Sequence, residues 1–271
     1  MIPPGPGGRA SGAGPPAAGP SPAGPSPAWR LRRYEVLAST SDLCVRLAEA
    51  GEPEGVAVLA LRQTEARGTR GRGWVSPPGA LALSVLLRPR GRTADAGQWA
   101  LLAAVAFAEA LARHAPSPEV GAAIRLKWPN DLLLDGRKLS GILIDAAAGE
   151  GGELAWLVIG FGANLGAAPD LGDRTAAGLG GPATPDQAAA SLLERLDHWR
   201  RVRLLDGFAP VRRAWLDRAH PPGTHLRVRV GGQELGGAFA GLSDDGALLL
   251  QANGRVHAFH TGEVLQAGSG R

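Results

Sequence analysis

The stretch at residues 125–145, RLKWPNDLLLDGRKLSGILID, constrains the fold more than any other part of the chain. Two apolar, strand-like runs, 132–134 and 138–144, lie on either side of Asp135-Gly136. An Asp-Gly pair between two such runs is a strong signal for a type I′ turn, because both central residues of that turn need positive φ. The sequence therefore predicts a β-hairpin at the centre of the chain.

Both lysines of the chain lie beside this hairpin. The sequence holds 29 lysines and arginines together, and only Lys127 and Lys138 are lysines. Pro129 lacks a backbone N–H, so residues 128–131 should form a polar kink between the two lysines. An ammonium is a compact charge, whereas a guanidinium is a planar fork. Two lysines so close together in an arginine-rich chain therefore indicate a task that needs a compact charge. The alternative is chance clustering. Gly141 predicts a bulge or a close backbone approach.

Composition limits the class of protein. A chain of 271 residues that is 44% hydrophobic can bury a sizeable core, and no apolar run is long enough to cross a membrane. A formal net charge of +4 permits anion binding without requiring nucleic acid. The single cysteine, Cys44, excludes an internal disulfide and a cysteine-based metal cluster, and we expect it to be a small buried hydrophobe. We therefore expect a cytoplasmic protein.

The chain divides into three parts by composition. Residues 1–28 are rich in proline, glycine and alanine and predict a disordered tail. Residues 29–220 alternate strand-like runs with helices, including an alanine- and leucine-rich helix at 97–114. Residues 221–271 contain four short strand-like runs separated by Gly-Gly, Asp-Gly and Asn-Gly turns, which predict a small antiparallel barrel.

A basic, glycine-rich loop precedes the hairpin in the sequence. Residues 63–74 read QTEARGTRGRGW, where arginines alternate with glycines. Guanidinium groups and free backbone N–H groups suit phosphate or carboxylate. The alternatives are a solvated linker or an RNA-binding glycine–arginine segment. Strand-like runs at 56–61 and 81–87 flank the loop closely and argue against a linker.

Several common catalytic motifs are absent from the sequence, among them the Walker A loop, the G-x-S-x-G elbow and the His-Glu-x-x-His zinc helix. Residues 160–166, GFGANLG, end a buried strand but lack the glycine spacing of a dinucleotide fingerprint. A basic loop, a lysine-bearing kink and a glycine-rich strand end suit the joint binding of a carboxylate and a nucleotide phosphate. Joining those groups is adenylation, which needs fixed cations around the phosphorus.

These segments resemble the signature of biotin protein ligases. The most specific match is KWPND followed by Lys-x-x-Gly-Ile-Leu, and the resemblance extends over residues 29–266. The supporting matches are the loop ending in Trp74, Ser76-Pro77, Leu83-Ser84, Gly160-x-Gly162-x-Asn164 and Ser39-Thr40. The resemblance implies an α+β fold, with a mixed β-sheet catalytic domain at 29–220 backed by helices and a small C-terminal SH3-like β-barrel at 221–271.

The resemblance also implies a two-step ligase reaction. Biotin and ATP, with Mg²⁺, would give biotinyl-5′-AMP, which would then acylate a lysine of a biotin carboxyl carrier domain of a biotin-dependent carboxylase. The tail has no room for a winged helix, so we expect a monofunctional enzyme that binds neither DNA nor membrane. A homodimer through an exposed sheet edge is compatible with this pattern. The alternatives are a lipoate ligase-type acyl transferase and a non-catalytic homologue that binds anions or RNA.

The matching positions imply roles for individual residues. The catalytic residues implied are Lys127, Arg67, Arg72 and Asp131. The biotin-binding residues implied are Ser39, Thr40, Ser41, Gln63, Arg67, Gly68, Lys127, Gly160 and Gly162. The nucleotide-binding residues implied are Arg70, Arg72, Trp74, Asn130, Lys138 and Asn164. For the metal the resemblance implies Mg²⁺ held mainly through the substrate phosphates.

Three positions depart from the family pattern. Ala66 replaces the first glycine of the loop, and Thr69 replaces its second arginine, which in the family helps to hold the adenylate phosphate. We hypothesise that Arg70 compensates; otherwise the enzyme should release more of its intermediate. Ser41 stands where the family usually has asparagine, and its hydroxyl can still cap a helix.

Overall fold

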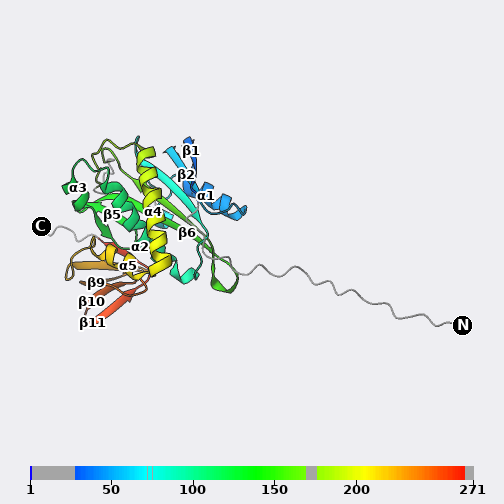
Figure 1. Ribbon diagram of the computed structural model, residues 1–271. Helices are drawn as coiled ribbons and strands as arrows, with labels where there is room; N and C mark the ends of the chain where they lie inside the picture. The colour runs from blue at the N-terminus through cyan, green and yellow to red at the C-terminus, as the bar shows by residue number, and fades with distance from the viewer. Residues whose placement is uncertain (2–27, 72, 75, 169–175, 266–271) are drawn as a thin grey trace.

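The computed structural model describes residues 1, 28–71, 73–74, 76–168 and 176–265, and of Arg70 only the backbone (Figure 1). The tail expected at 1–28 thus lies almost wholly outside the described residues. The strands are β1 Arg30–Leu37, β2 Val56–Gln63, β3 Leu81–Leu87, β4 Arg125–Lys127, β5 Asp131–Leu134, β6 Arg137–Ala148, β7 Leu154–Ala163, β8 His225–Val230, β9 Gln233–Leu242, β10 Leu248–Ala252, β11 Arg255–Phe259 and β12 Glu263–Leu265. The helices are α1 Thr40–Glu49, α2 Ala96–Ala112, α3 Pro118–Ala123, α4 Pro185–Asp206 and α5 Ala209–Leu216.

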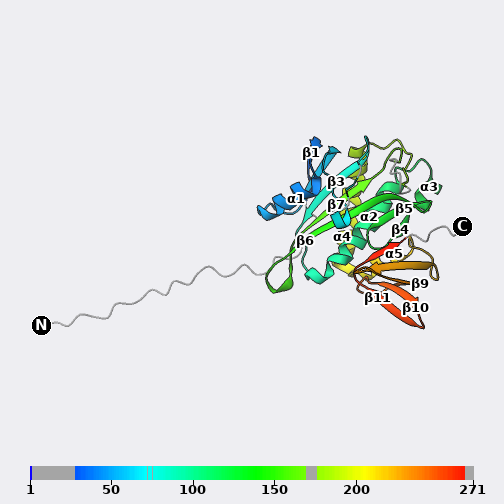
Figure 2. The ribbon, with the colours of Figure 1, turned by 180° about the vertical axis from the view of Figure 1, so that it is seen from behind.

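A seven-stranded mixed sheet forms the larger layer. Its strand order is β1-β2-β3-β7-β6-β5-β4, with β1 and β2 parallel and the other neighbours antiparallel. Helices α2 and α4 pack together over one face, as Figure 1 shows. The view from behind in Figure 2 shows α1 on the opposite face, where it contacts β2, β3 and β7. The mixed sheet backed by helices is confirmed.

Local signals explain the helix ends and the central turn. Ser39 caps α1 by accepting a hydrogen bond from the Asp42 N–H at 3.2 Å. Thr184 and Gln187 form a capping box at the start of α4. Asp135 and Gly136 have φ angles of 50° and 72°, as a type I′ turn requires, so the predicted hairpin is confirmed.

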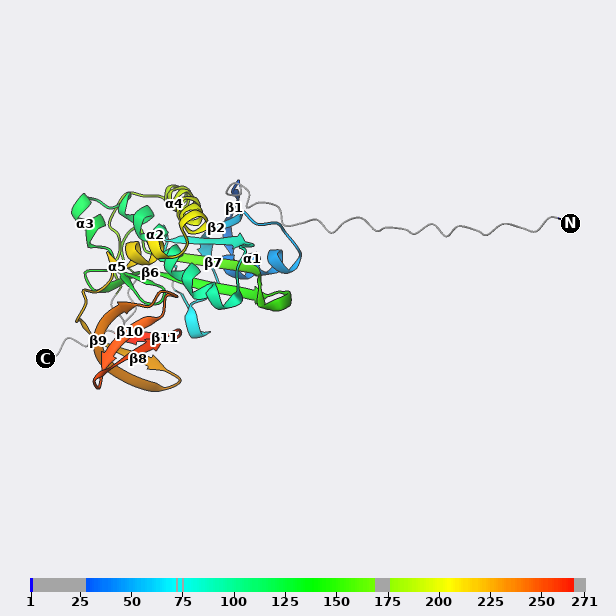
Figure 3. The same ribbon diagram turned by 60° about the horizontal axis from the view of Figure 1, so that its bottom comes forward.

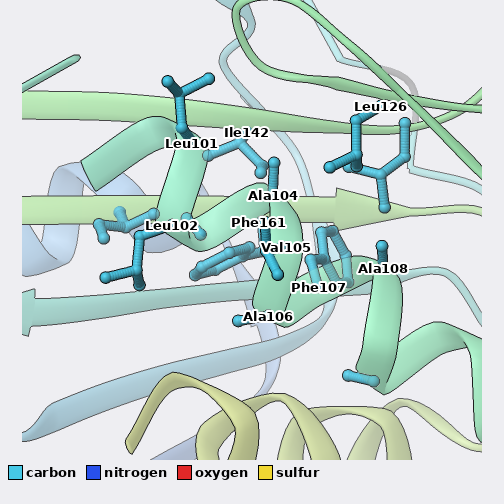
Figure 4. Packing of buried hydrophobic residues seen from close by; sticks show 14 of the residues in the cluster. Leu101, Leu102, Ala104, Val105, Ala106, Phe107, Ala108, Leu126, Ile142 and Phe161 are labelled. Carbon is cyan, nitrogen blue, oxygen red and sulfur yellow. The ribbon is translucent and has the colours of Figure 1, made fainter. Parts of the chain in front are cut away.

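The core between the sheet and the helices follows from the alanine- and leucine-rich sequence of α2. Figure 4 shows Leu101, Val105 and Phe107 packed against the sheet. The rings of Phe107 and Phe161 meet edge to face, with centroids 5.2 Å apart. Burying one such side chain contributes about 1.5–3 kcal/mol. Because strand residues alternate between faces, Phe161 points to α2 while its glycine neighbours face the other side.

Two expectations about strand lengths need correction. The sequence predicted a buried strand at 154–159 followed by the glycine-rich end at 160–166, but β7 continues to Ala163 because β3 and β6 both pair with it that far. The second hairpin strand was expected at 138–144, and β6 runs to Ala148. Helix α3 was not foreseen, because it is only 6 residues long and lacks a helical apolar stripe.

The C-terminal strands form an antiparallel sheet beside α5 (Figure 3). Its order, β11-β10-β9-β8-β12, leaves β11 and β12 as edges among the described residues, so the predicted SH3-like barrel is not confirmed. The sequence predicted four strands here and missed the short strand β12. The Trp128 indole N–H donates to the Gly246 carbonyl at 3.3 Å and joins this sheet to the polar kink.

Candidate active site

A pocket lies on the α1 side of the large sheet. It is bounded by the N-terminal end of α1, the glycine–arginine loop, the polar kink and the strands β6 and β7. The space between its lining atoms, counted together with the open solvent at its mouth, is about 490 Å³. Most of the residues singled out from the sequence meet here, although they come from segments more than 100 residues apart. The pocket has a neutral end and a charged end.

Hydroxyl and amide groups form the neutral end. Thr40, Ser41 and Gln63 line the pocket, and the first two are buried at the start of α1. Gln63, at the end of β2, accepts from the Thr40 backbone N–H at 2.8 Å. Ser39 is committed to capping α1 and does not line the pocket. Three of the four predicted polar residues are therefore positioned to contact one end of a ligand.

Glycines form the floor of the pocket. Gly141 of β6 and Gly162 of β7 are cross-strand partners, and the Trp74 ring lies over both of them. A Cβ on Gly162 would stand 2.8 Å from Cε2 of Trp74, and one on Gly141 would stand 3.6 Å from Cζ3. The indole can occupy this place only because residue 162 is glycine, whereas a Cβ on Gly141 would make an ordinary van der Waals contact with the ring, so Gly141 shows the predicted close approach only to Lys138, whose Nζ would lie 3.3 Å from such a Cβ.

The two lysines converge on one carboxylate. Lys138 Nζ lies 2.6 Å from Oδ1 of Asp131, and Lys127 Nζ lies 3.7 Å from Oδ2. The side chains of Lys127 and Asp131 are only 13% and 17% exposed, so this cluster is held in a region that water screens poorly. Lys138 also lies over the Trp74 ring, with its Nζ 5.8 Å from the centroid, and links the charged cluster to the aromatic floor.

Lys127 stands behind Asp131 and does not itself line the pocket. Burial lowers the pKa of the Lys127 ammonium, and Lys138 lowers it further, whereas Asp131 and Glu263 raise it. Glu263 belongs to β12 of the C-terminal sheet, so both sheets act on the charge of this lysine. Asn130, which lines the pocket, is fixed by a hydrogen bond from its side-chain amide to the Ile142 carbonyl.

Arg67 is held at the mouth of the pocket by two carboxylates. Its guanidinium donates to Asp42 of α1 and, at 2.7 Å, to Asp145 of β6. The hydrogen bond to Asp42 is the main cause that raises the pKa of Arg67. Gly68 lines the pocket next to it. The loop is therefore tied to α1 and β6 through one side chain, and a backbone bridge between Arg67 and Gly73 closes it.

Three of the residues predicted to bind the nucleotide are not placed in the pocket. Arg72 and the side chain of Arg70 lie outside the described residues. Asn164 is 2% exposed and does not line the pocket. Its side-chain amide donates to the Ala177 carbonyl at 2.9 Å, so this asparagine ties the end of β7 to a later loop.

The sequence predicted no site role for Ser84, Asp42, Asp145 and Glu263, although Leu83-Ser84 was among the matches to the family. Ser84 had a detectable signal, because it is the one polar residue in the otherwise apolar strand LALSVLL and it is fully buried. Asp42 and Asp145 had none, because their function depends on where Arg67 lies. Among the described residues no group of three or more His, Cys, Asp or Glu side chains could hold a metal ion.

The sequence was also compared with known proteins. It matches the model of the biotin/lipoate A/B protein ligase family over residues 34–164 and that of the biotin protein ligase C terminal domain over residues 223–265. A biotin–[acetyl-CoA-carboxylase] ligase of Paracoccus denitrificans is 36% identical over 220 residues, which cover 78% of this chain and 90% of the relative. One of Mycobacterium tuberculosis is 33% identical over 247 residues, 86% of this chain and 89% of the relative.

A solved structure has the same fold. The biotin protein ligase from Aquifex aeolicus in complex with biotin and ATP superimposes with a TM-score of 0.72 at 25% identity, over 87% of this chain and 97% of that one.

Proposed function

The chain belongs to the biotin/lipoate A/B protein ligase family, and we propose that it is a biotin–[biotin carboxyl-carrier protein] ligase. In this reaction ATP activates biotin as biotinyl-5′-AMP, and the biotinyl group passes to one lysine of a carrier protein. Relatives named biotin–[acetyl-CoA-carboxylase] ligase, and a similar structure that holds biotin and ATP, support this activity.

The observation that carries the proposal for the site is the polarity of the pocket. Its neutral end offers Thr40, Ser41 and Gln63 to an uncharged polar ring, and its charged end offers Lys138 and, behind Asp131, Lys127. Biotin has the matching polarity, with a cyclic urea at one end and a carboxylate at the other. Bound in this orientation, its carboxylate lies where the cations are.

In the first step a carboxylate oxygen of biotin attacks the α-phosphorus of ATP and pyrophosphate leaves. Negative charge builds up on the α-phosphate oxygens, and fixed cations stabilise it without reorganising. In our proposal Lys127 contacts the biotin carboxylate and the α-phosphate, while Lys138 and Arg70 contact phosphates. Trp74 packs against the adenine, and Asn130 and Asn164 bind near the nucleotide.

In the second step the amine of the carrier lysine attacks the acyl carbon and AMP leaves with its phosphate oxygen. Arg67 and Arg72 cover the adenylate and exclude water that would hydrolyse it. Gly160, Gly162 and Gly68 let the substrate approach the backbone, and Ser39 supports the biotin site by capping α1. Asp131 orients the lysines around the reacting groups.

The proposal extends to substrates and organisation. Magnesium enters with ATP as Mg·ATP and is held mainly by the phosphates. Mg²⁺ bound to a nucleotide usually needs only one or two protein carboxylates. We propose that residues 29–220 form the catalytic domain and residues 221–271 a C-terminal domain. Each helix among the described residues is too short or too polar to span a bilayer. A cytoplasmic location, the absence of DNA binding and a homodimer stay predictions.

The first test is incorporation of labelled biotin into a carrier domain in the presence of Mg·ATP. We expect the wild-type chain to label the carrier and Lys127→Ala to lose most of this activity. Arg137→Ala is a matched control, because Arg137 is an exposed cation of the same hairpin and forms a long ion pair, 3.9 Å, with the exposed carboxylate of Asp135. This control should keep its activity.

A parallel reaction with lipoate separates the alternatives. Transfer of lipoate but not biotin would replace the proposed function by that of a lipoate ligase. No adenylate and no transfer with either acid would support a non-catalytic homologue. Measuring pyrophosphate release apart from carrier labelling shows which step a variant has lost.

A further inference from the structure

Four side chains behind the neutral end of the pocket form one continuous hydrogen-bonded series. Gln63 Oε1 is 3.1 Å from Thr40 Oγ1, which is 2.8 Å from Ser84 Oγ, which in turn is 3.1 Å from Ser41 Oγ. The series joins β2, the start of α1 and β3. Thr40, Ser41 and Ser84 are 3%, 7% and 0% exposed, so water has little access to the hydroxyl groups.

The direction of every hydrogen bond in this series is fixed by its first member. The Thr40 backbone N–H can only donate, and it lies 2.8 Å from the same Gln63 atom, so that atom is the amide oxygen. Thr40 Oγ1 must then donate its single proton to Gln63. Ser84 must in turn donate to Thr40, and Ser41 must donate to Ser84.

The consequence lies at the far end of the series. The only hydroxyl proton of Ser41 is committed to Ser84, so toward the pocket Ser41 Oγ offers lone pairs alone. Ser41 lines the pocket, whereas Ser84 does not. Gly160 makes the arrangement possible, because a Cβ at that position would overlap Ser41 Oγ. The neutral end therefore presents a hydrogen-bond acceptor whose polarity is set from behind.

We propose that Ser84, acting through Ser41, is a specificity-determining positioning residue that selects a substrate ring bearing an N–H donor. The proposal rests on the proposed function and refines it. The cyclic urea of biotin carries such donors, whereas the dithiolane ring of lipoate carries none. A ring that offers only acceptors cannot donate to Ser41 Oγ, so this buried acceptor stays unpaired. An unpaired buried polar group costs binding energy, and the site therefore discriminates strongly between otherwise similar ligands.

The test compares biotin with two analogues in which one ring N–H or the other is replaced by oxygen. Binding is measured by calorimetry without ATP, so catalysis does not enter. For wild type, we expect at least one analogue to bind about tenfold or more weakly than biotin. In Ser84→Ala the Ser41 proton is released and can turn toward the ligand, so the ratio of analogue Kd to biotin Kd should fall by about tenfold.

Two further variants complete the design. Ser140→Ala is the matched control, because Ser140 is a fully buried serine of β6 whose Oγ has no hydrogen-bond partner among the described residues, and the ratio should stay at the wild-type value. Ser84→Cys weakens the same hydrogen bonds with little change in volume and replaces Ser84→Ala if that variant does not fold; it should lower the ratio in the same direction.

Wild-type ratios near one for both analogues would overturn the inference while leaving the proposed function intact, and so would an unchanged ratio in the Ser84 variants. A wild-type chain that binds no biotin would overturn both.

Discussion

Replacing Asp131 by asparagine removes a carboxylate that pairs with both Lys127 and Lys138. Lys127 and Lys138 would then face each other across a neutral amide, in a place where the Lys127 side chain is 13% exposed. Asparagine keeps the shape of the side chain and removes its charge. The variant therefore isolates the electrostatic part of the cluster.

The magnitude follows from the distances. Opposite charges about 4 Å apart attract by about 4 kcal/mol at an effective dielectric constant of about 20. Desolvation offsets most of that energy while the pair is intact, but removing one partner of a buried pair costs about 3–5 kcal/mol because a charge is left unpaired. Lys138 is 40% exposed and can turn to water, so we expect a loss of about 3 kcal/mol near neutral pH.

The pH dependence has a definite sign. Burial already lowers the pKa of Lys127 below its ordinary value of 10.5, and Asp131 opposes that effect. Without Asp131 the pKa of Lys127 falls further, so between the folded-state pKa and 10.5 the unfolded chain binds more protons than the folded chain. The free energy of unfolding of the variant must then rise with pH relative to that of wild type. The stability difference between wild type and variant therefore becomes smaller as the pH rises toward 10.5.

Urea unfolding of wild type and Asp131→Asn at several pH values measures both quantities. Asp135→Asn is the matched control: its side chain is 70% exposed, asparagine tolerates the positive φ of that turn, and we expect a change within about 0.5 kcal/mol. A deficit below about 0.5 kcal/mol for Asp131→Asn near neutral pH, or one that widens with pH, would refute the reasoning.

Three further predictions use other parts of the site. Thr69→Arg should slow the release of biotinyl-5′-AMP, because a guanidinium can hold the phosphate bidentately. Filtration of the preformed complex measures the release rate, with Thr69→Ser as the control. A release rate equal to that of Thr69→Ser would count against the prediction. Gly162→Ala should raise the KM for ATP by about tenfold, because its Cβ would stand 2.8 Å from the Trp74 ring and displace it; the same overpacking should lower the free energy of unfolding by about 1–3 kcal/mol, and an unchanged KM would contradict the prediction. Burial raises the pKa of the Cys44 thiol to about 12, so a thiol reagent should modify the folded chain near pH 8 far more slowly than the unfolded chain, and equal rates would show that the thiol is accessible.

The short-range elements of the fold were predictable from the sequence. The Asp135-Gly136 turn and the limits of β3 matched expectation because each depends on neighbours within a few residues. The signature around Lys127 likewise identified the family. The C-terminal barrel stays unconfirmed, because strand periodicity indicates strands but not whether the last strand closes on the first.

Tertiary structure alone decided how the site is assembled. Strand order places β7 between β3 and β6, and register sets Gly141 beside Gly162 under Trp74. The same packing joins Ser84 to Thr40, 44 residues away, and so fixes the proton of Ser41. No local pattern encodes these contacts, because each depends on which strands pair and on which face a side chain falls. The sequence determined which chemical groups the protein has, and the packing of the sheet determined their distances, their partners and the direction of their hydrogen bonds.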